Sequence, residues 1–119
     1  MPPERQSTST PPLKNEVLLI LLSLAADAMH GYAIMQRISD DSDGTVVLQA
    51  GAFYRTMRNM LEDGLLEECD DPAGAPRDDK KRRFYRITRR GRSVAHLEVE
   101  RLAGLVRMGR SRALAPRVK

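Results

Sequence analysis

The segment QAGAFYRTMRNMLEDGLLEE, from Gln49 to Glu68, decides the fold of this chain. Its apolar side chains recur at the spacing that places them on one side of a helix: Phe53, Met57, Met60 and Leu61. The opposite side is polar and carries Tyr54, Arg55, Arg58, Asn59 and Glu62. Gly64 follows at the point where helices commonly end with a residue of positive φ. The segment therefore predicts an amphipathic helix over residues 49–63, followed by an extended stretch.

A basic hairpin comes after this helix. Residues 65–69 and 82–88 predict two strands, and the second of them, RRFYRIT, alternates with period two. The loop between them, DDPAGAPRDDK, combines Pro, Gly and Asp. The C-terminal side of this loop is basic and consists of Lys80, Lys81, Arg82 and Arg83. Alternatively, the helix is an ordinary surface helix and the basic residues are an ordinary solvated charge run, without a binding role.

A polar helix and a basic hairpin in this order are typical of a winged helix-turn-helix. In that fold the helix lies in a DNA groove and the cations of the wing contact phosphates. The expected fold class is therefore mainly α with a small β-hairpin wing.

Two further helices are predicted upstream. Residues 13–26 are apolar nearly all round, so we expect the domain core to cover one side of this helix and a partner subunit the other. A tight connection at 27–30 leads to a second helix over 31–41. Its buried side should consist of Tyr32, Ile34, Met35 and Ile38. The β-branched residues 45–48 predict a short strand, and residues 1–12, rich in Pro, Ser and Thr, predict a disordered arm.

The apolar run at 17–26, VLLILLSLAA, resembles the core of a signal peptide. It is far shorter than the ~20 residues that span a bilayer, and no compact cationic segment precedes it. We interpret it as a buried core helix of a cytoplasmic protein without a membrane partner.

The last predicted element is a long helix over residues 89–115, which Thr88 can cap and after which residues 116–119 fray. Its apolar positions have the spacing of a coiled-coil seam, which consists of Ala95, Val99, Leu102 and Val106. Leu105 widens this apolar stripe. So small a domain offers this helix no further partner, so we expect it to pack on its symmetry mate. The first helix should join this interface through Leu18, Leu21 and Leu22. Residues 13–88 would then form the DNA-binding domain and 89–115 the dimerisation helix.

Composition narrows the function classes. The chain has 119 residues, enough for one small domain, and its formal net charge of +4 favours a polyanionic partner. Aromatic residues make up 4% with no Trp, which argues against binding single strands by base stacking. Cys69 is the only cysteine, and His30 and His96 lie on different elements without a ligand partner at suitable spacing. No phosphate loop or nucleophile motif occurs, so we expect no catalytic residues, no metal and no cofactor.

With these residues in view, the sequence resembles the PadR-type transcriptional regulators, in the subgroup with a single C-terminal helix. The resemblance covers residues 13–106. Four motifs carry it: LLILLSLAADAMHGYAI at 18–34, LQAGAFYRTM at 48–57, LEDGLLEE at 61–68 and RRFYRITRRGR at 82–92. One departure is Ala52, which lacks the hydroxyl of the Thr that family members commonly carry there.

The resemblance implies a homodimer, usually a repressor, on a near-palindromic operator in double-stranded DNA. It implies that the first and last helices form the dimer and that Tyr54 and Arg55 meet DNA. The full set of residues expected at DNA is Gln49, Gly51, Tyr54, Arg55, Arg58, Lys80, Lys81, Arg82 and Arg83.

Two other hypotheses stand beside the DNA-binding repressor. In the first, which adds to it, an apolar cavity between the first and last helices binds a small hydrophobic effector and shifts the dimer geometry. In the second, the winged helix is a protein-interaction module without sequence-specific DNA binding, a reading favoured by the many acidic residues of the wing.

Overall fold

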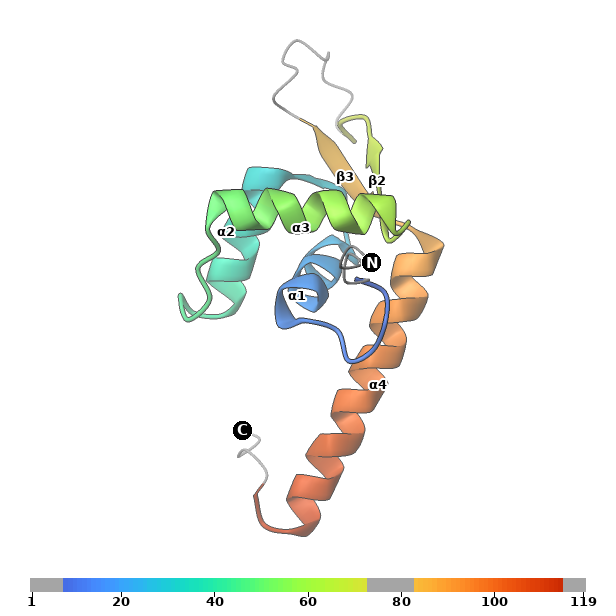
Figure 1. Cartoon of the computed structure of the whole chain (residues 1–119). Coiled ribbons are helices and arrows are strands. Elements are labelled where there is room, and N and C mark those ends of the chain that lie inside the picture. The colour runs from blue at the N-terminus through green and yellow to red at the C-terminus, as the bar shows by residue number, and fades with distance from the viewer. Residues whose placement is uncertain (1–7, 73–82, 115–119) are drawn as a thin grey trace, which may run out of the picture.

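The computed structural model describes residues 8–72 and 83–114. Within these ranges, four helices and a three-stranded antiparallel sheet form a winged helix-turn-helix (Figure 1). In chain order, the elements are α1 (Asn15–Leu24), β1 (Met29–His30), α2 (Gly31–Asp41), α3 (Ala50–Glu62), β2 (Leu66–Cys69), β3 (Phe84–Ile87) and α4 (Arg89–Ser111). The predicted fold class, mainly α with a β-hairpin wing, is confirmed.

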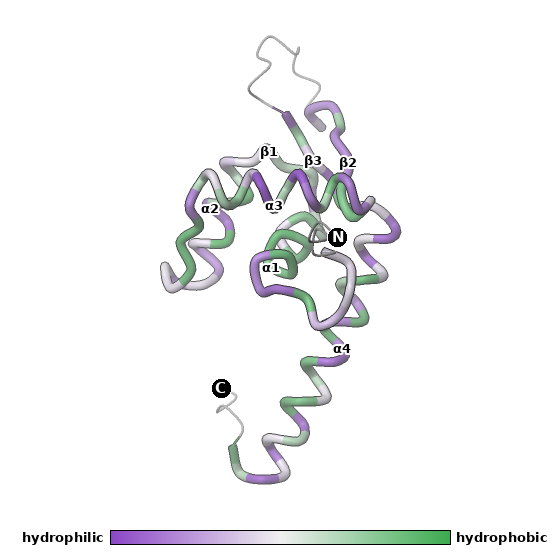
Figure 2. Tube along the Cα trace, viewed as in Figure 1, coloured by the Kyte–Doolittle hydropathy of each residue, from purple (hydrophilic) through white to green (hydrophobic). Residues whose placement is uncertain are grey.

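Helix α1 is the centre of the core. It contacts α2, α3, α4 and β3. Figure 2 shows most of α1 in the colour of hydrophobic residues, at the middle of the molecule. Ile20 and Leu21 are fully buried, as is Phe53 of α3. A helix that is apolar nearly all round is stable in water only when other elements cover it, and here three helices and the sheet do so. None of the described helices is long and apolar enough to cross a membrane.

Helix α3 ends as its sequence predicts. Gly64 has a φ of +77°. Its N–H donates a hydrogen bond to the carbonyl of Leu61, and the N–H of Leu65 donates one to the carbonyl of Met60. These two bonds form a Schellman motif, which satisfies carbonyls at the helix end and turns the chain into β2. The predicted helix over 49–63 is therefore confirmed, with Gln49 and Asp63 as its caps.

Strand assignments upstream of α3 differ from the expectation. Residues 45–48 form no strand, because no other strand lies beside them to pair with. Conversely, the end of the connection expected at 27–30 forms β1, which pairs antiparallel with β3 through Met29 opposite Tyr85. Tyr32, expected on the buried side of α2, is 68% exposed, whereas Ile34 and Ile38 are buried as expected.

The junction between the wing and α4 depends on two residues. The Thr88 side chain caps α4 by accepting a hydrogen bond from the Gly91 N–H, at 3.0 Å, and donates one to the carbonyl of Gly64, at 2.6 Å. Gly91 is needed because a Cβ there would lie 2.2 Å from the carbonyl oxygen of Leu65. The cap at Thr88 confirms the predicted start of the last helix.

The N-terminal segment contacts the domain along residues 8–13. The backbone N–H of Thr8 donates to the Asp63 carboxylate, at 2.8 Å, and a guanidinium nitrogen of Arg90 donates to the Ser9 hydroxyl, at 3.2 Å. These bonds tie the segment to the end of α3 and the start of α4. The expectation of a disordered arm over residues 1–12 stays a prediction, and residues 1–7 lie outside the described ranges.

Candidate nucleic-acid interface

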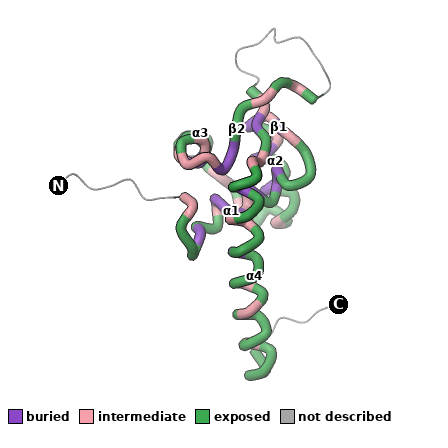
Figure 3. Tube along the Cα trace, turned by 90° about the vertical axis from the view of Figure 1, so that its right-hand side faces the viewer, coloured by how far each residue is buried: buried purple, intermediate pink, exposed green. Residues whose placement is uncertain are grey.

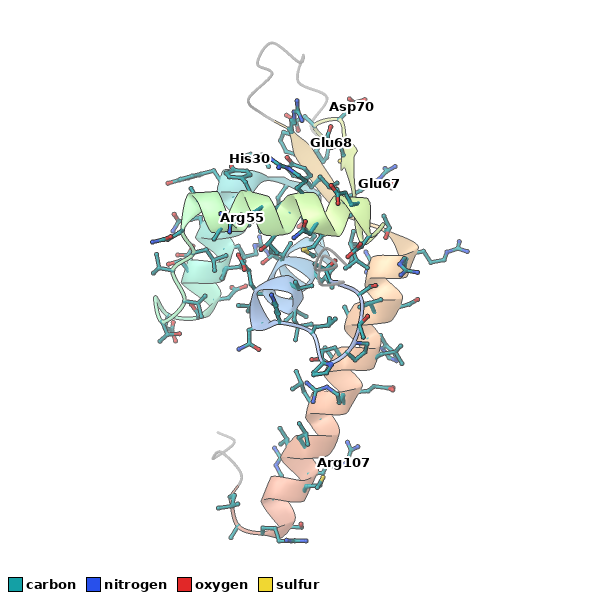
Figure 4. The ribbon with its side chains drawn as sticks, in the orientation of Figure 1. His30, Arg55, Glu67, Glu68, Asp70 and Arg107 are labelled. Atoms are coloured by element: carbon teal, nitrogen blue, oxygen red, sulfur yellow. The ribbon has the colours of Figure 1, made fainter. Side chains whose placement is uncertain are left out.

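The polar face of α3 is exposed except at Asn59, which is half-buried. Arg55 and Arg58 are exposed, as are Gln49 and Gly51 at the start of the helix. The buried face holds Phe53, Met57 and Met60, so the two faces separate as the sequence predicts. Figure 4 shows that Arg55 lies along α3, with the hairpin above this helix. This face presents two guanidinium groups to solvent with no ion pair of their own among the described residues.

Tyr54 is held more firmly than a free surface side chain. It is 46% exposed, and its ring packs edge-on against Phe53, with the ring centroids 5.0 Å apart. A Cβ built on Gly31 would lie 2.7 Å from the Tyr54 hydroxyl oxygen, so the ring lies directly over the start of α2. The glycine of the HGY turn thus makes room for Tyr54. The turn is visible in the sequence, but its contact with Tyr54 appears only in the fold.

His30 caps the helix that carries this glycine. Its Nδ1 accepts a hydrogen bond from the Ala33 N–H, at 3.2 Å, and its ring meets Phe84 edge-on, with centroids 5.5 Å apart. The histidine therefore links α2 to the sheet. Among the described residues, no group of His, Cys, Asp or Glu is arranged to hold a metal ion.

The wing carries basic side chains that are already paired. Arg83 bonds to Glu68, at 3.2 Å, and Arg86 to Glu67, at 2.6 Å. The hydrogen bond from Arg86 to Glu67 raises the pKa of the Arg86 guanidinium further above its usual range. Arg83 was among the predicted DNA contacts, but its pairing was not predicted. The other wing cations of that prediction, Lys80, Lys81 and Arg82, lie outside the described residues.

The residues expected at a dimer interface fall into two groups. Leu18 is 8% exposed and Leu21 is fully buried, so their side chains have little surface left for a second subunit. Ala95 and Leu102 are partly buried against the same core. The exposed group consists of Leu22 at 49%, Val99 at 44%, Leu105 at 49% and Val106 at 39%. Leu18 and Leu21 belong to the protomer's own core, and the dimer interface as a whole stays a prediction.

The C-terminal half of α4 extends beyond the domain (Figure 1). Leu102 is the last α4 side chain that packs against the core, and Figure 3 shows the following turns almost entirely exposed. Leu105, Val106 and Met108 lie on these turns, with Met108 63% exposed. A helix with such a stripe is stable in water mainly when another surface covers it.

Glu98 was missed by the sequence interpretation. It is 1% exposed and lies on the side of α4 that faces the core. Both of its oxygens accept hydrogen bonds from Arg101, at 2.7 and 2.8 Å, and one also accepts from the Leu13 N–H, at 3.1 Å. The bonds from Arg101 are the main cause that lowers the pKa of Glu98. The only sign in the sequence is the Glu-x-x-Arg spacing, which surface helices also carry.

The grooves on the described surface include an open one beside the wing and another along α2. One of about 500 Å³ lies beside the wing and is lined by Ala28, Glu68, Cys69, Asp70, Pro72 and Arg86. The other, of about 350 Å³, runs along α2 and is lined by His30, Tyr32, Ala33, Gln36, Arg37 and Asp40. Neither groove is lined by α1 or α4, so the expected effector cavity between those helices stays a prediction.

Comparison with known proteins agrees with this geometry. The model of the transcriptional regulator PadR-like family matches residues 20–97. No curated protein sequence matches the chain. Among solved structures, a transcriptional regulator from Clostridium thermocellum superposes with a TM-score of 0.67 at 19% identity, covering 81% of this chain and 87% of that one.

Two further solved structures are similar. A PadR family transcription regulator from Clostridium difficile has a TM-score of 0.67 at 15% identity, with 82% of this chain and 97% of that one covered. A PadR family transcriptional regulator from Eggerthella lenta has a TM-score of 0.56 at 26% identity, with 83% of each chain covered.

Proposed function

The chain belongs to the PadR-like family of transcriptional regulators, and from this premise we propose that it is a homodimeric repressor of a near-palindromic operator. Proteins of this family are DNA-binding regulators, not enzymes. The observation that carries the proposal is the exposed polar face of α3, with Tyr54, Arg55 and Arg58 beside the β2–β3 hairpin.

In the proposed complex, α3 lies in the major groove. Arg55 and Arg58 have the donor geometry that suits guanine edges and phosphates. Tyr54, fixed over Gly31, would place its hydroxyl at a constant position, which suits a backbone contact that sets the register of the helix. Gln49 and Gly51 would approach the backbone at the start of α3, and the wing residues 80–83 would add sequence-independent affinity.

The proposed dimer uses the exposed apolar side chains of α1 and α4. Leu22, Val99, Leu105 and Val106 would be covered by the same residues of a second subunit, as a two-fold axis requires. Two α3 helices related by this axis would reach two half-sites, so a symmetric protein matches a near-palindromic operator. In this proposal, residues 13–88 bind DNA and 89–115 make the dimer.

The experiment that tests the proposal compares Arg55→Ala with the parent protein. Fluorescence-anisotropy titrations would use a library of duplexes that includes the DNA upstream of its own gene, at two salt concentrations. We expect the parent to bind one palindromic site tightly, and Arg55→Ala to lose about 10- to 100-fold in affinity there, because a good base contact contributes about 1–3 kcal/mol.

Arg107→Ala is the matched control for this substitution. Arg107 is an equally exposed arginine near the far end of α4, and Figure 4 shows it remote from Arg55. We expect Arg107→Ala to bind the operator like the parent. If Arg55→Ala also binds the operator like the parent, α3 is not the recognition helix.

Two alternatives give different results in the same titration. Weak binding that is equal for all duplexes would favour the protein-interaction module, for which the paired wing carboxylates Glu67 and Glu68 are the supporting observation. An operator affinity that changes when small hydrophobic compounds are added would support the additional effector hypothesis.

A further inference from the structure

The two ion pairs of the wing lie on opposite faces of the hairpin. Glu68 is directly opposite Tyr85, and Glu67 is directly opposite Arg86. Successive side chains of a strand point to alternate faces, so Glu68, Tyr85 and Arg83 share one face, whereas Glu67 and Arg86 share the other. Each arginine bonds to the glutamate on its own face.

The face with Glu68 is the one next to the recognition helix. Tyr85 on this face is 7% exposed and packs in the core. Burial, followed by the negative charge of Glu68, raises the pKa of the Tyr85 phenol, and Tyr54 of α3 is close enough to contribute. The pair formed by Glu68 and Arg83 therefore continues the surface of α3 towards the wing. Figure 4 shows Glu68 above α3, between the labelled His30 and Asp70.

This location matters because the surface beside α3 is where phosphates would lie. The side chains of Arg83 and Glu68 are 64% and 42% exposed, so water screens their ion pair, and such pairs contribute about 0–1 kcal/mol. A phosphate can therefore replace Glu68 as the partner of Arg83 at little cost. While Glu68 stays in place, its charge repels the same phosphate.

We propose that Glu68 competes with DNA phosphate for Arg83 and thereby lowers the affinity of the wing for the DNA backbone. This inference rests on the proposed function, since it assumes that α3 and the wing meet DNA. The competition is independent of base sequence, because phosphate contacts carry no sequence information. Glu68 thus sets how tightly the protein binds any duplex, while α3 sets which duplex it prefers.

The test compares Glu68→Gln with Glu67→Gln in the full chain. Both substitutions remove one carboxylate from β2 and free one arginine, but on opposite faces of the hairpin. We expect Glu68→Gln to raise affinity about fivefold at low salt, by the same factor for operator and random duplexes. The slope of log K against log salt should steepen by about 0.9, the value of one additional phosphate contact. Glu67→Gln should change the affinity less than about twofold.

A double-mutant cycle with Arg83→Gln identifies the mechanism. If the competition is for Arg83, Glu68→Gln raises affinity much less in the Arg83→Gln background than in the parent, because only the repulsion between Glu68 and the phosphate is then relieved. An equal gain in both backgrounds would overturn the proposal, as would equal gains from Glu67→Gln and Glu68→Gln. All three positions are exposed, and thermal unfolding should confirm that each variant folds like the parent.

The random duplex separates failure of this inference from failure of the proposed function. A parent protein without operator preference would contradict the repressor proposal, yet the gain expected from Glu68→Gln on random DNA would still be measurable. Conversely, a parent with clear operator preference and a Glu68→Gln variant that binds like it would overturn only the competition.

Discussion

At the scale of single residues, a buried carboxylate is the least expected feature of this protein. Glu98 exchanges water for three hydrogen bonds, two from Arg101 and one from the Leu13 backbone. An ionised carboxylate is tolerated in such a place only when its oxygens are bonded and its charge is paired. Both conditions hold, so Glu98 joins the N-terminal segment to α4.

Glu98 should make the stability of the protein sensitive to acid. The pKa of Glu98 is lowered in the folded state, mainly by the hydrogen bonds from Arg101. A carboxyl with a lowered pKa adds stability above its unfolded pKa, about 4.3, and loses it as the pH falls through the folded value. We expect Glu98→Gln to be less stable than the parent at pH 7 and the difference to shrink as the pH falls towards 3. Urea unfolding at several pH values measures this, and a constant difference would contradict it.

At the scale of elements, the residues near each helix end were sufficient to predict the helices. Strand β1 and the burial of Glu98 depend instead on contacts between segments far apart in the sequence. The turn at Gly64 and the cap from Thr88 to Gly91 each lie within a few residues, so the local sequence was sufficient to place the end of α3 and the start of α4. Strand β1 exists only because Tyr85 lies beside Met29, and nothing near Met29 in sequence announces this pairing. The same reason explains Glu98, whose partner Leu13 is 85 residues away.

Adding a methyl group at Gly91, where α4 packs on the turn before β2, should lower the stability of the protein. In Gly91→Ala, the new Cβ would approach the Leu65 carbonyl oxygen to 2.2 Å, and a backbone atom cannot move aside as a side chain can. We expect a loss of about 3 kcal/mol in the free energy of unfolding, the upper end of the usual range for overpacking. Urea denaturation of purified protein measures the change.

Gly51→Ala is the control for this substitution. Gly51 is also helical, but no atom lies within 4 Å of the Cβ that would be added. We expect the variant to be as stable as the parent or more stable by about 0.5–1 kcal/mol, since Ala favours helices. Equal stability of both variants would show that α4 can shift away from Leu65.

At the scale of the whole molecule, the protomer is a winged domain from which half a helix projects. The α-carbon extents of 55 × 45 × 26 Å reflect this projection. Figure 4 shows Arg55 of α3 far from Arg107, which lies on the projecting half of α4. Association through α4 would therefore fix the distance between two recognition helices without covering either.

Dimerisation should fail when a charge enters the projecting stripe. Leu105 is 49% exposed and lies beyond the part of α4 that packs on the core, so Leu105→Glu should leave the protomer folded. We expect it to sediment as a monomer at concentrations where the parent is a dimer, and to bind the operator at least about tenfold more weakly, since two half-sites are no longer held together. Analytical ultracentrifugation measures the association.

Val47→Glu is the control for Leu105→Glu, because it introduces the same charge at an exposed apolar residue outside α4. Val47 is 77% exposed in the segment between α2 and α3, far along the chain from α4. The variant should stay dimeric. A Leu105→Glu protein that sediments like the parent would show that subunits associate through another surface.

The hydrogen bond between Leu13 and Glu98 also has a consequence for biosynthesis. Ribosomes add roughly 5–20 residues per second, so the 85 residues between these partners take on the order of ten seconds to make. During that interval the nascent chain already contains the apolar run at 17–26, while α4, which covers one side of it, does not yet exist. The apolar side chains of α1 that α4 covers in the folded chain therefore stay uncovered by α4 until this helix has left the ribosome.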